Sequence, residues 1–228
     1  MDNPGSIDDL PGKSANHTGM DNPANNYFYP DRMGRIILMG TEEILGRNGV
    51  NAVLNLAGLP EFIDHYPANQ QNLNFSFEKV SRLQGALEDF YGPHGGRGVA
   101  LRIGRASFQH ILREFGAPFG LTDLAFRLLP LKSKLKIGTS ALADIFNNYT
   151  DQRVRLEDKG KLILWEIERC PICWQRHSEN PACQMAVGLL QEGLHWMSGG
   201  KFYNVEEGNC IARGDLTCTL IIEKVPMV

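Results

Sequence analysis

Apolar positions in the first two thirds of the chain recur every three to four residues, which is the spacing of amphipathic helices. The stretches with this pattern are 33–59, 76–90, 99–115, 121–131 and 135–149. Glycines interrupt the first stretch at Gly46 and follow the second at Gly92. Ser76 stands where a helix N-cap is expected. This part of the chain is therefore predicted to be mainly helical.

The pattern changes after Asp151. Apolar and charged residues alternate from Val154, a turn follows at 158–160, and a second apolar run covers 162–167, which together predict a β-hairpin. A helix is predicted over 182–197, followed by strands over 202–212 and 217–225. Helices followed by strand, strand, helix, strand and strand predict an α+β fold, with an antiparallel β-sheet packed against several helices.

The 228 residues are enough for one substantial domain. Residues 1–30 are rich in Asn, Asp, Gly and Pro, and we expect a disordered N-terminal tail there. Residues 31–150 are predicted to be the helical portion of a single domain. Residues 151–228 are predicted to be a β-rich, metal-binding portion of that same domain, because every cysteine of the chain lies there.

Charge and hydropathy narrow the possible functions. The net charge is −3, which does not match the basic footprint of a nucleic-acid binder. No apolar run is long enough for a transmembrane segment, and the acidic, polar start does not match a signal peptide, so the cytoplasm is the expected compartment. The glycine-rich stretch 92–98 lacks the Lys-Ser/Thr of a phosphate loop and is predicted to join two helices.

All five cysteines lie between positions 170 and 218. In a cytoplasmic protein, such clustering indicates a metal site, redox chemistry or catalysis rather than disulfides. Glu207 and Cys210 lie near the end of one predicted strand, and Cys218 lies on the next. Cys183 begins a predicted helix, where the helix N-terminus favours a thiolate. Three thiolates and one carboxylate form a four-coordinate set that zinc accepts.

Spacing alone leaves other ligand sets open. Cys170 and Cys173 form a Cys-Pro-Ile-Cys motif with the spacing of half a zinc ribbon. An equally good set on spacing is Cys170, Cys173, Cys210 and Cys218. His177 and His195 compete as ligands, and four of the five thiolates could instead hold an iron–sulfur cluster.

Residues 160–225 resemble the 4-vinyl reductase domain family. The matching elements are Glu207-Gly208-Asn209-Cys210, the turn Gly214-Asp215, and Cys218 followed by alternating apolar residues. The resemblance implies that the metal ligands are Cys183, Glu207, Cys210 and Cys218. It leaves Cys170 and Cys173 as an additional pair for metal binding or redox chemistry.

The resemblance also implies a fold similar to that of transport-particle tethering subunits, a homodimer, and a small hydrophobic ligand. Such ligands are aromatic compounds, or tetrapyrroles such as bacteriochlorophyll precursors. The predicted function is therefore a zinc-stabilised binding module that acts as a sensor or carrier, with Trp165, Trp174 and Trp196 as candidate ligand-binding residues. The alternatives are a tetrapyrrole-modifying, vinyl reductase-like enzyme and an assembly scaffold. The binding module is favoured over an enzyme, and no catalytic residue is assigned, because no nucleotide fingerprint or catalytic motif is recognised.

Overall fold

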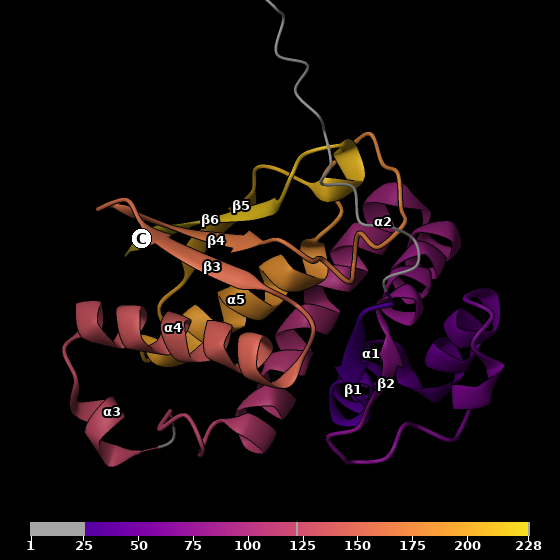
Figure 1. Cartoon of the computed structure of the whole chain (residues 1–228), viewed down its shortest axis with the longest axis horizontal. Coiled ribbons are helices and arrows are strands. Elements are labelled where there is room, and N and C mark those ends of the chain that lie inside the picture. The colour runs from indigo at the N-terminus through magenta and orange to yellow at the C-terminus, as the bar shows by residue number, and fades with distance from the viewer. Residues whose placement is uncertain (1–25, 122, 228) are drawn as a thin grey trace, which may run out of the picture.

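The computed structural model describes residues 26–121 and 123–227, and its main elements are a four-stranded antiparallel sheet and five helices (Figure 1). The helices are α1 (Asp31–Leu56), α2 (Phe77–Phe115), α3 (Leu124–Leu128), α4 (Leu131–Tyr149) and α5 (Gln184–Met197). The strands of the sheet are β3 (Val154–Asp158), β4 (Leu162–Ile167), β5 (Tyr203–Glu207) and β6 (Cys218–Pro226). The predicted α+β class is confirmed.

Two glycines break the long helices, but the connection predicted over 92–98 is wrong in length, because only Gly92 is non-helical and residues 93–98 belong to α2. Gly46 in α1 has φ 69° and Gly92 in α2 has φ 75°, values that glycine adopts at little cost. Ser76 caps α2 as expected, with its Oγ accepting from the backbone N–H of Lys79 at 3.4 Å. The helix predicted over 121–131 is wrong in length: α3 covers Leu124–Leu128, and Leu131 already begins α4.

The sheet has the strand order β3-β4-β6-β5, and both predicted hairpins are part of it. Ile167, the last residue of β4, lies opposite Cys218, the first residue of β6. The chain that leaves β4 therefore begins beside the start of β6. The strand predicted over 202–212 is too long, since β5 ends at Glu207 and Cys210 lies in the connection that follows.

A second, two-stranded sheet lies at the other end of the molecule. It pairs β1 (Phe28–Pro30) with β2 (Leu73–Ser76) in antiparallel orientation. The sequence does not predict it, because strands of three and four residues are too short for a clear alternation. The expected N-terminal tail falls outside the described residues up to position 25, while its last residues form β1.

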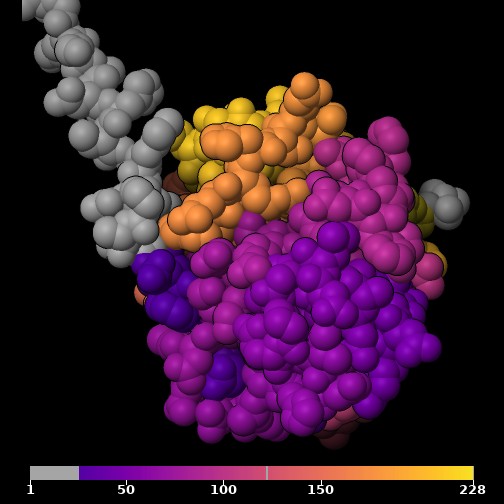
Figure 2. Space-filling model, turned by 90° about the vertical axis from the view of Figure 1, so that its right-hand side faces the viewer, coloured from indigo at the N-terminus to yellow at the C-terminus, as the bar shows by residue number. Residues whose placement is uncertain are grey.

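The helices are arranged around one large apolar core. Helices α4 and α5 lie on the same side of the four-stranded sheet, and α2 packs against both α5 and α1 (Figure 1). Figure 2 shows the segment after β4, in orange, between the helical part of the chain and the C-terminal strands. Among the described residues, no helix has the length and apolar character needed to cross a membrane.

Asn147 connects the end of α4 to the edge strand β3. Its side-chain amide donates to the carbonyl of Val154 at 2.9 Å and accepts from the N–H of Val154 at 2.8 Å. Asn147→Ala removes both hydrogen bonds, so we expect the free energy of unfolding to fall by about 1–3 kcal/mol in urea denaturation. The matched control is Asn148→Ala at an exposed position, with an expected change within about 0.5 kcal/mol. Equal losses in the two variants would contradict this role.

Candidate metal cluster and apolar pocket

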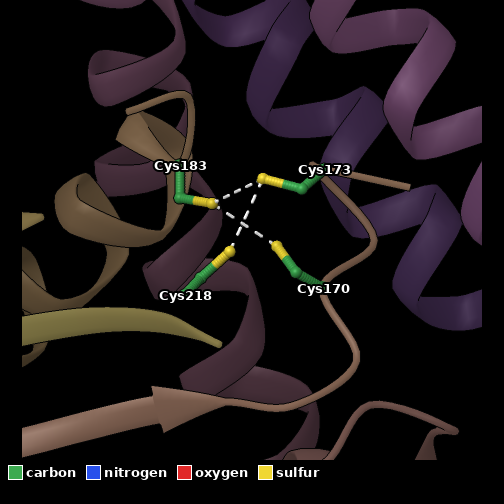
Figure 3. Close-up of side chains that lie close together, drawn as sticks. All are labelled: Cys170, Cys173, Cys183 and Cys218. Carbon is green, nitrogen blue, oxygen red and sulfur yellow. Dashed lines mark hydrogen bonds between the residues drawn. The ribbon is translucent and has the colours of Figure 1, made fainter. Parts of the chain in front are cut away.

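All five cysteines converge on one buried cluster, with exposed fractions of 0–2 %. Figure 3 shows Cys170 and Cys173 entering from the segment after β4, Cys183 from the start of α5, and Cys218 from the start of β6. Cys210 enters from the β5–β6 connection, immediately before the short 3₁₀ helix Ile211–Arg213. The cluster therefore joins three parts of the fold that are separate in the sequence.

Cys173 lies closest to the centre of the cluster. Its Sγ is 3.2 Å from the Sγ of Cys183, and 3.5 Å from those of Cys210 and Cys218. The Sγ of Cys170 lies 3.4 Å from that of Cys183. Four thiolates around one zinc ion, at about 2.3 Å each, are separated by about 3.8 Å along the edges of a tetrahedron. The observed sulfur separations are thus near those of a mononuclear thiolate site.

The connection between β5 and β6 is held by short-range hydrogen bonds. The N–H of Cys210 donates to Asp215 Oδ2 at 2.8 Å, and the N–H of Ile211 donates to the Sγ of Cys218 at 3.3 Å. Gly214, at φ 98°, turns the chain back towards β6. These contacts explain why a carboxylate and glycine between Cys210 and Cys218 bring the two thiols together.

Glu207 adds a carboxylate to the edge of the cluster. Its Oε2 accepts from the backbone N–H of Cys183 at 2.7 Å, whereas its buried Oε1 has no hydrogen-bond partner among the described residues. Burial above all, and then Cys210, raises the pKa of Glu207 to about 8.

The structure brings together two four-donor groups, in each of which all ligand atoms lie within 4.8 Å of one another. They are Cys183, Glu207, Cys210 and Cys218, the set that the family resemblance implies, and Cys170, Cys173, Cys183 and Cys218. His177 and His195 belong to neither group. The neighbouring thiols Cys170 and Cys173 hold the pKa of Cys183 well above its usual range.

An apolar cavity of about 50 Å³ lies beside this cluster. Helices α1, α2, α4 and α5 contribute to its wall, together with β1, β4 and the segment after β4. Among the described lining residues, only Ala186 and Leu189 on α5 are not buried, so the mouth of the cavity lies there. Cys170 lines the cavity and also belongs to the thiol cluster.

Three polar side chains stand in this apolar wall. The hydroxyl of Tyr29 donates to Gln152 Oε1, which leaves that pair satisfied. The Oγ of Ser107, a residue that is 2 % exposed, has no hydrogen-bond partner among the described residues. Sequence reasoning missed all three, because Tyr29, Ser107 and Gln152 meet only through the tertiary fold.

The three tryptophans named from the sequence lie in different places. Trp165 on β4 lines the cavity. Trp174 packs against Tyr27, with ring centroids 5.3 Å apart, and its carbonyl accepts from Ser81 Oγ at 2.6 Å. Trp196 stacks on Phe126 at 5.9 Å in a smaller apolar cluster under α3. Neither Trp174 nor Trp196 lines this cavity.

No family model and no curated protein matches the sequence, so the resemblance to the 4-vinyl reductase domain family stays a prediction. Several solved structures match the fold. An unliganded Fe(II) H-NOX protein from K. algicida is 11% identical over 85% of this chain and 95% of its own, with a TM-score of 0.55. A structure concerned with heme distortion in the H-NOX family is 16% identical over 88% of this chain and 97% of its own, with a TM-score of 0.53.

A partial likeness is to the phenol-responsive sensory domain of the transcription activator PoxR. It is 18% identical over 63% of this chain and 72% of its own, with a TM-score of 0.45. At such identities, the H-NOX structures show a shared fold and do not determine the ligand of this chain.

The pocket of this chain does not fit a haem. Its volume of about 50 Å³ is far below the roughly 300–1,000 Å³ of sites for larger small molecules. Histidine, cysteine and tyrosine are side chains that hold haem iron. None of the described lining residues is a histidine, and the cysteine and tyrosine of the lining are already engaged: the thiol of Cys170 contacts Cys183, and the phenol of Tyr29 donates to Gln152.

Proposed function

We propose that this domain binds a small, single-ring hydrophobic ligand and acts as a sensor or carrier. The observation that carries the proposal is the apolar cavity whose lining includes Ser107, a residue with a buried and unpartnered Oγ. A buried hydroxyl without a partner is destabilising, and a ligand with one hydrogen-bonding group removes that penalty. The H-NOX-like fold is compatible with an internal ligand site.

The size of the cavity limits the ligand. An engineered cavity of about 150 Å³ is known to bind benzene, so about 50 Å³ requires the wall to move for even one ring. Met185 and Leu189 on α5 stand beside the mouth, and methionine adapts its shape easily. A tetrapyrrole such as a bacteriochlorophyll precursor needs far more space. We therefore favour an aromatic ligand over the tetrapyrrole and over a tetrapyrrole-modifying enzyme.

We also propose that the cysteine cluster holds one zinc ion, with Cys183, Cys210 and Cys218 among its ligands. The convergence of buried thiols at separations near those of a tetrahedral site supports this. An iron–sulfur cluster with several irons and sulfides would require its thiolates to lie farther apart than around one ion. The implied homodimer stays a prediction.

Ligand binding is tested with phenol and toluene, which differ by one hydroxyl. In isothermal titration calorimetry, we expect the chain to bind phenol about 5- to 10-fold more tightly than toluene, because only phenol can pair with Ser107. Ser107→Ala should abolish this preference while toluene binding remains. Ser81→Ala is the matched control, since this buried hydroxyl lies on the same helix and outside the cavity.

Ala186→Phe tests the position of the site. Ala186 lies at the mouth and is partly exposed, so a larger side chain should close the cavity without overfilling the core. We expect this variant to bind neither phenol nor toluene, and Ala117→Phe at an exposed position to bind both. Unchanged binding in Ala186→Phe would refute a ligand site in this cavity.

A further inference from the structure

The segment from Cys170 to Trp174 contributes residues to both the thiol cluster and the apolar cavity. Cys170, Pro171 and Ile172 line the cavity, while Cys173 contacts the other thiols of the cluster. In Figure 3, the side chains of Cys170 and Cys173 leave this segment and face Cys183 and Cys218. One short stretch of chain therefore contributes to both sites.

The position of Cys173 is that of a fourth ligand. Cys183, Cys210 and Cys218 lie within 4.8 Å of one another. The Sγ of Cys173 lies at 3.2, 3.5 and 3.5 Å from these three sulfurs, which places it at the apex of a tetrahedron with the three as its base. Cys170 lies within 4.8 Å of Cys183 and Cys218, with a closest sulfur separation of 3.4 Å to Cys183, but it shares no four-donor group with Cys210.

Glu207 is the competing fourth donor. Its Oε2 is already engaged by the backbone N–H of Cys183 at 2.7 Å, an interaction that positions Cys183 at the start of α5. Its Oε1 is buried and has no partner among the described residues, so it is the atom that could reach an ion. Four-thiolate sites are common for structural zinc. In such a site, Glu207 would not bind the ion and would instead orient the ligand Cys183 through its backbone N–H.

We propose that Cys173, and not Glu207, is the fourth ligand of the ion, and that the ion thereby links the pocket wall to the β5–β6 hairpin and α5. This inference rests on the proposed zinc site. An ion held by Cys173 fixes the segment that carries Cys170, Pro171 and Ile172. Ion binding and ligand binding then affect each other's affinity, since both depend on the position of the same segment.

The ligand set is tested on the purified full-length chain by elemental analysis and by competition with a chromophoric chelator. We expect Cys173→Ser to bind zinc roughly 100-fold more weakly or not at all, and Glu207→Gln to keep the ion with at most about a 10-fold loss. Cys170→Ser is the matched control and should bind zinc like the unaltered chain. Retention of zinc by Cys173→Ser together with its loss from Glu207→Gln would overturn the assignment.

Cobalt substitution reports the number of thiolate ligands in the unaltered chain, so this test does not require any variant to fold. In the unaltered chain, thiolate-to-cobalt charge-transfer absorption should correspond to four thiolates, and three thiolates would overturn the inference. An unaltered chain that binds no metal would refute the proposed zinc site itself.

The link to the pocket is tested by titrating phenol into the zinc-loaded and the chelator-treated chain. We expect the affinity of the chain for phenol to change by about 5-fold or more when zinc is removed. An equal affinity in both states would refute the link, while no phenol binding in either state would refute the proposed ligand and leave the cobalt result standing.

Discussion

Cys218→Ser is expected to abolish zinc binding and to lower the free energy of unfolding by about 4 kcal/mol when free zinc exceeds its Kd by about 1,000-fold. Cys218 begins β6 and is wholly buried, and its Sγ also accepts from the N–H of Ile211. A serine hydroxyl is a poor replacement for a thiolate ligand. The ion joins the segment after β4, the β5–β6 connection and α5, so its loss removes a cross-link that the unfolded chain lacks.

Urea denaturation with and without chelator measures this effect. The chelator should lower the midpoint of the unaltered chain to near that of Cys218→Ser and should leave the variant almost unchanged. Cys170→Ser serves as the control, because it removes a buried thiol of the cluster that we do not assign to the ion. A midpoint of the unaltered chain that does not respond to chelator would contradict a structural role for zinc.

The sequence predicts the regular elements well where periodicity is long. The long helices α1, α2, α4 and α5 and the two hairpins carry repeated apolar positions, and glycines at Gly46 and Gly92 mark the breaks. Short elements carry too few positions to show a period. This is why β1 and β2 are missed, and why α3 is much shorter than predicted.

The cluster shows what spacing can and cannot decide. The five cysteines and Glu207 are recognisable from the sequence, and the structure brings all six together. Which of these side chains come close enough to bind one ion depends on the register of the strands. Because Ile167 lies opposite Cys218, the segment that leaves β4 carries Cys170 and Cys173 to the start of β6. No local pattern encodes that pairing.

The pocket is less predictable than the cluster. Tyr29 and Gln152 are hydrogen-bonded although 123 residues apart, and Ser107 reaches the cavity from the middle of a long helix. Each residue is unremarkable in its own stretch of sequence. The three tryptophans likewise occupy a pocket wall, a core edge and a separate apolar cluster, which composition cannot distinguish.

Gly188→Ala is expected to destabilise the fold by about 3 kcal/mol or more, because α2 and α5 touch through their backbones at this point. A Cβ at Gly188 would lie 1.9 Å from the carbonyl oxygen of Leu101, and a Cβ at Gly104 would lie 1.9 Å from that of Met185. Backbone atoms cannot rotate away as side chains can, so the two helices must separate. Helix α5 carries Cys183 at its start and the mouth of the cavity on its exposed side, so this shift should also weaken zinc and phenol binding.

Gly98→Ala on α2 separates this clash from the general effect of replacing a helical glycine. Gly98 is exposed, and a Cβ there would meet nothing within 4 Å. We therefore expect the free energy of unfolding to rise by about 1 kcal/mol, because alanine has the higher helix propensity. If urea denaturation shows that the free energy of unfolding falls in Gly188→Ala and rises in Gly98→Ala, the destabilisation comes from the contact between α2 and α5. A change below about 0.5 kcal/mol for Gly188→Ala would mean that the helices adjust freely, and that α5 does not hold Cys183 and the pocket mouth in fixed positions.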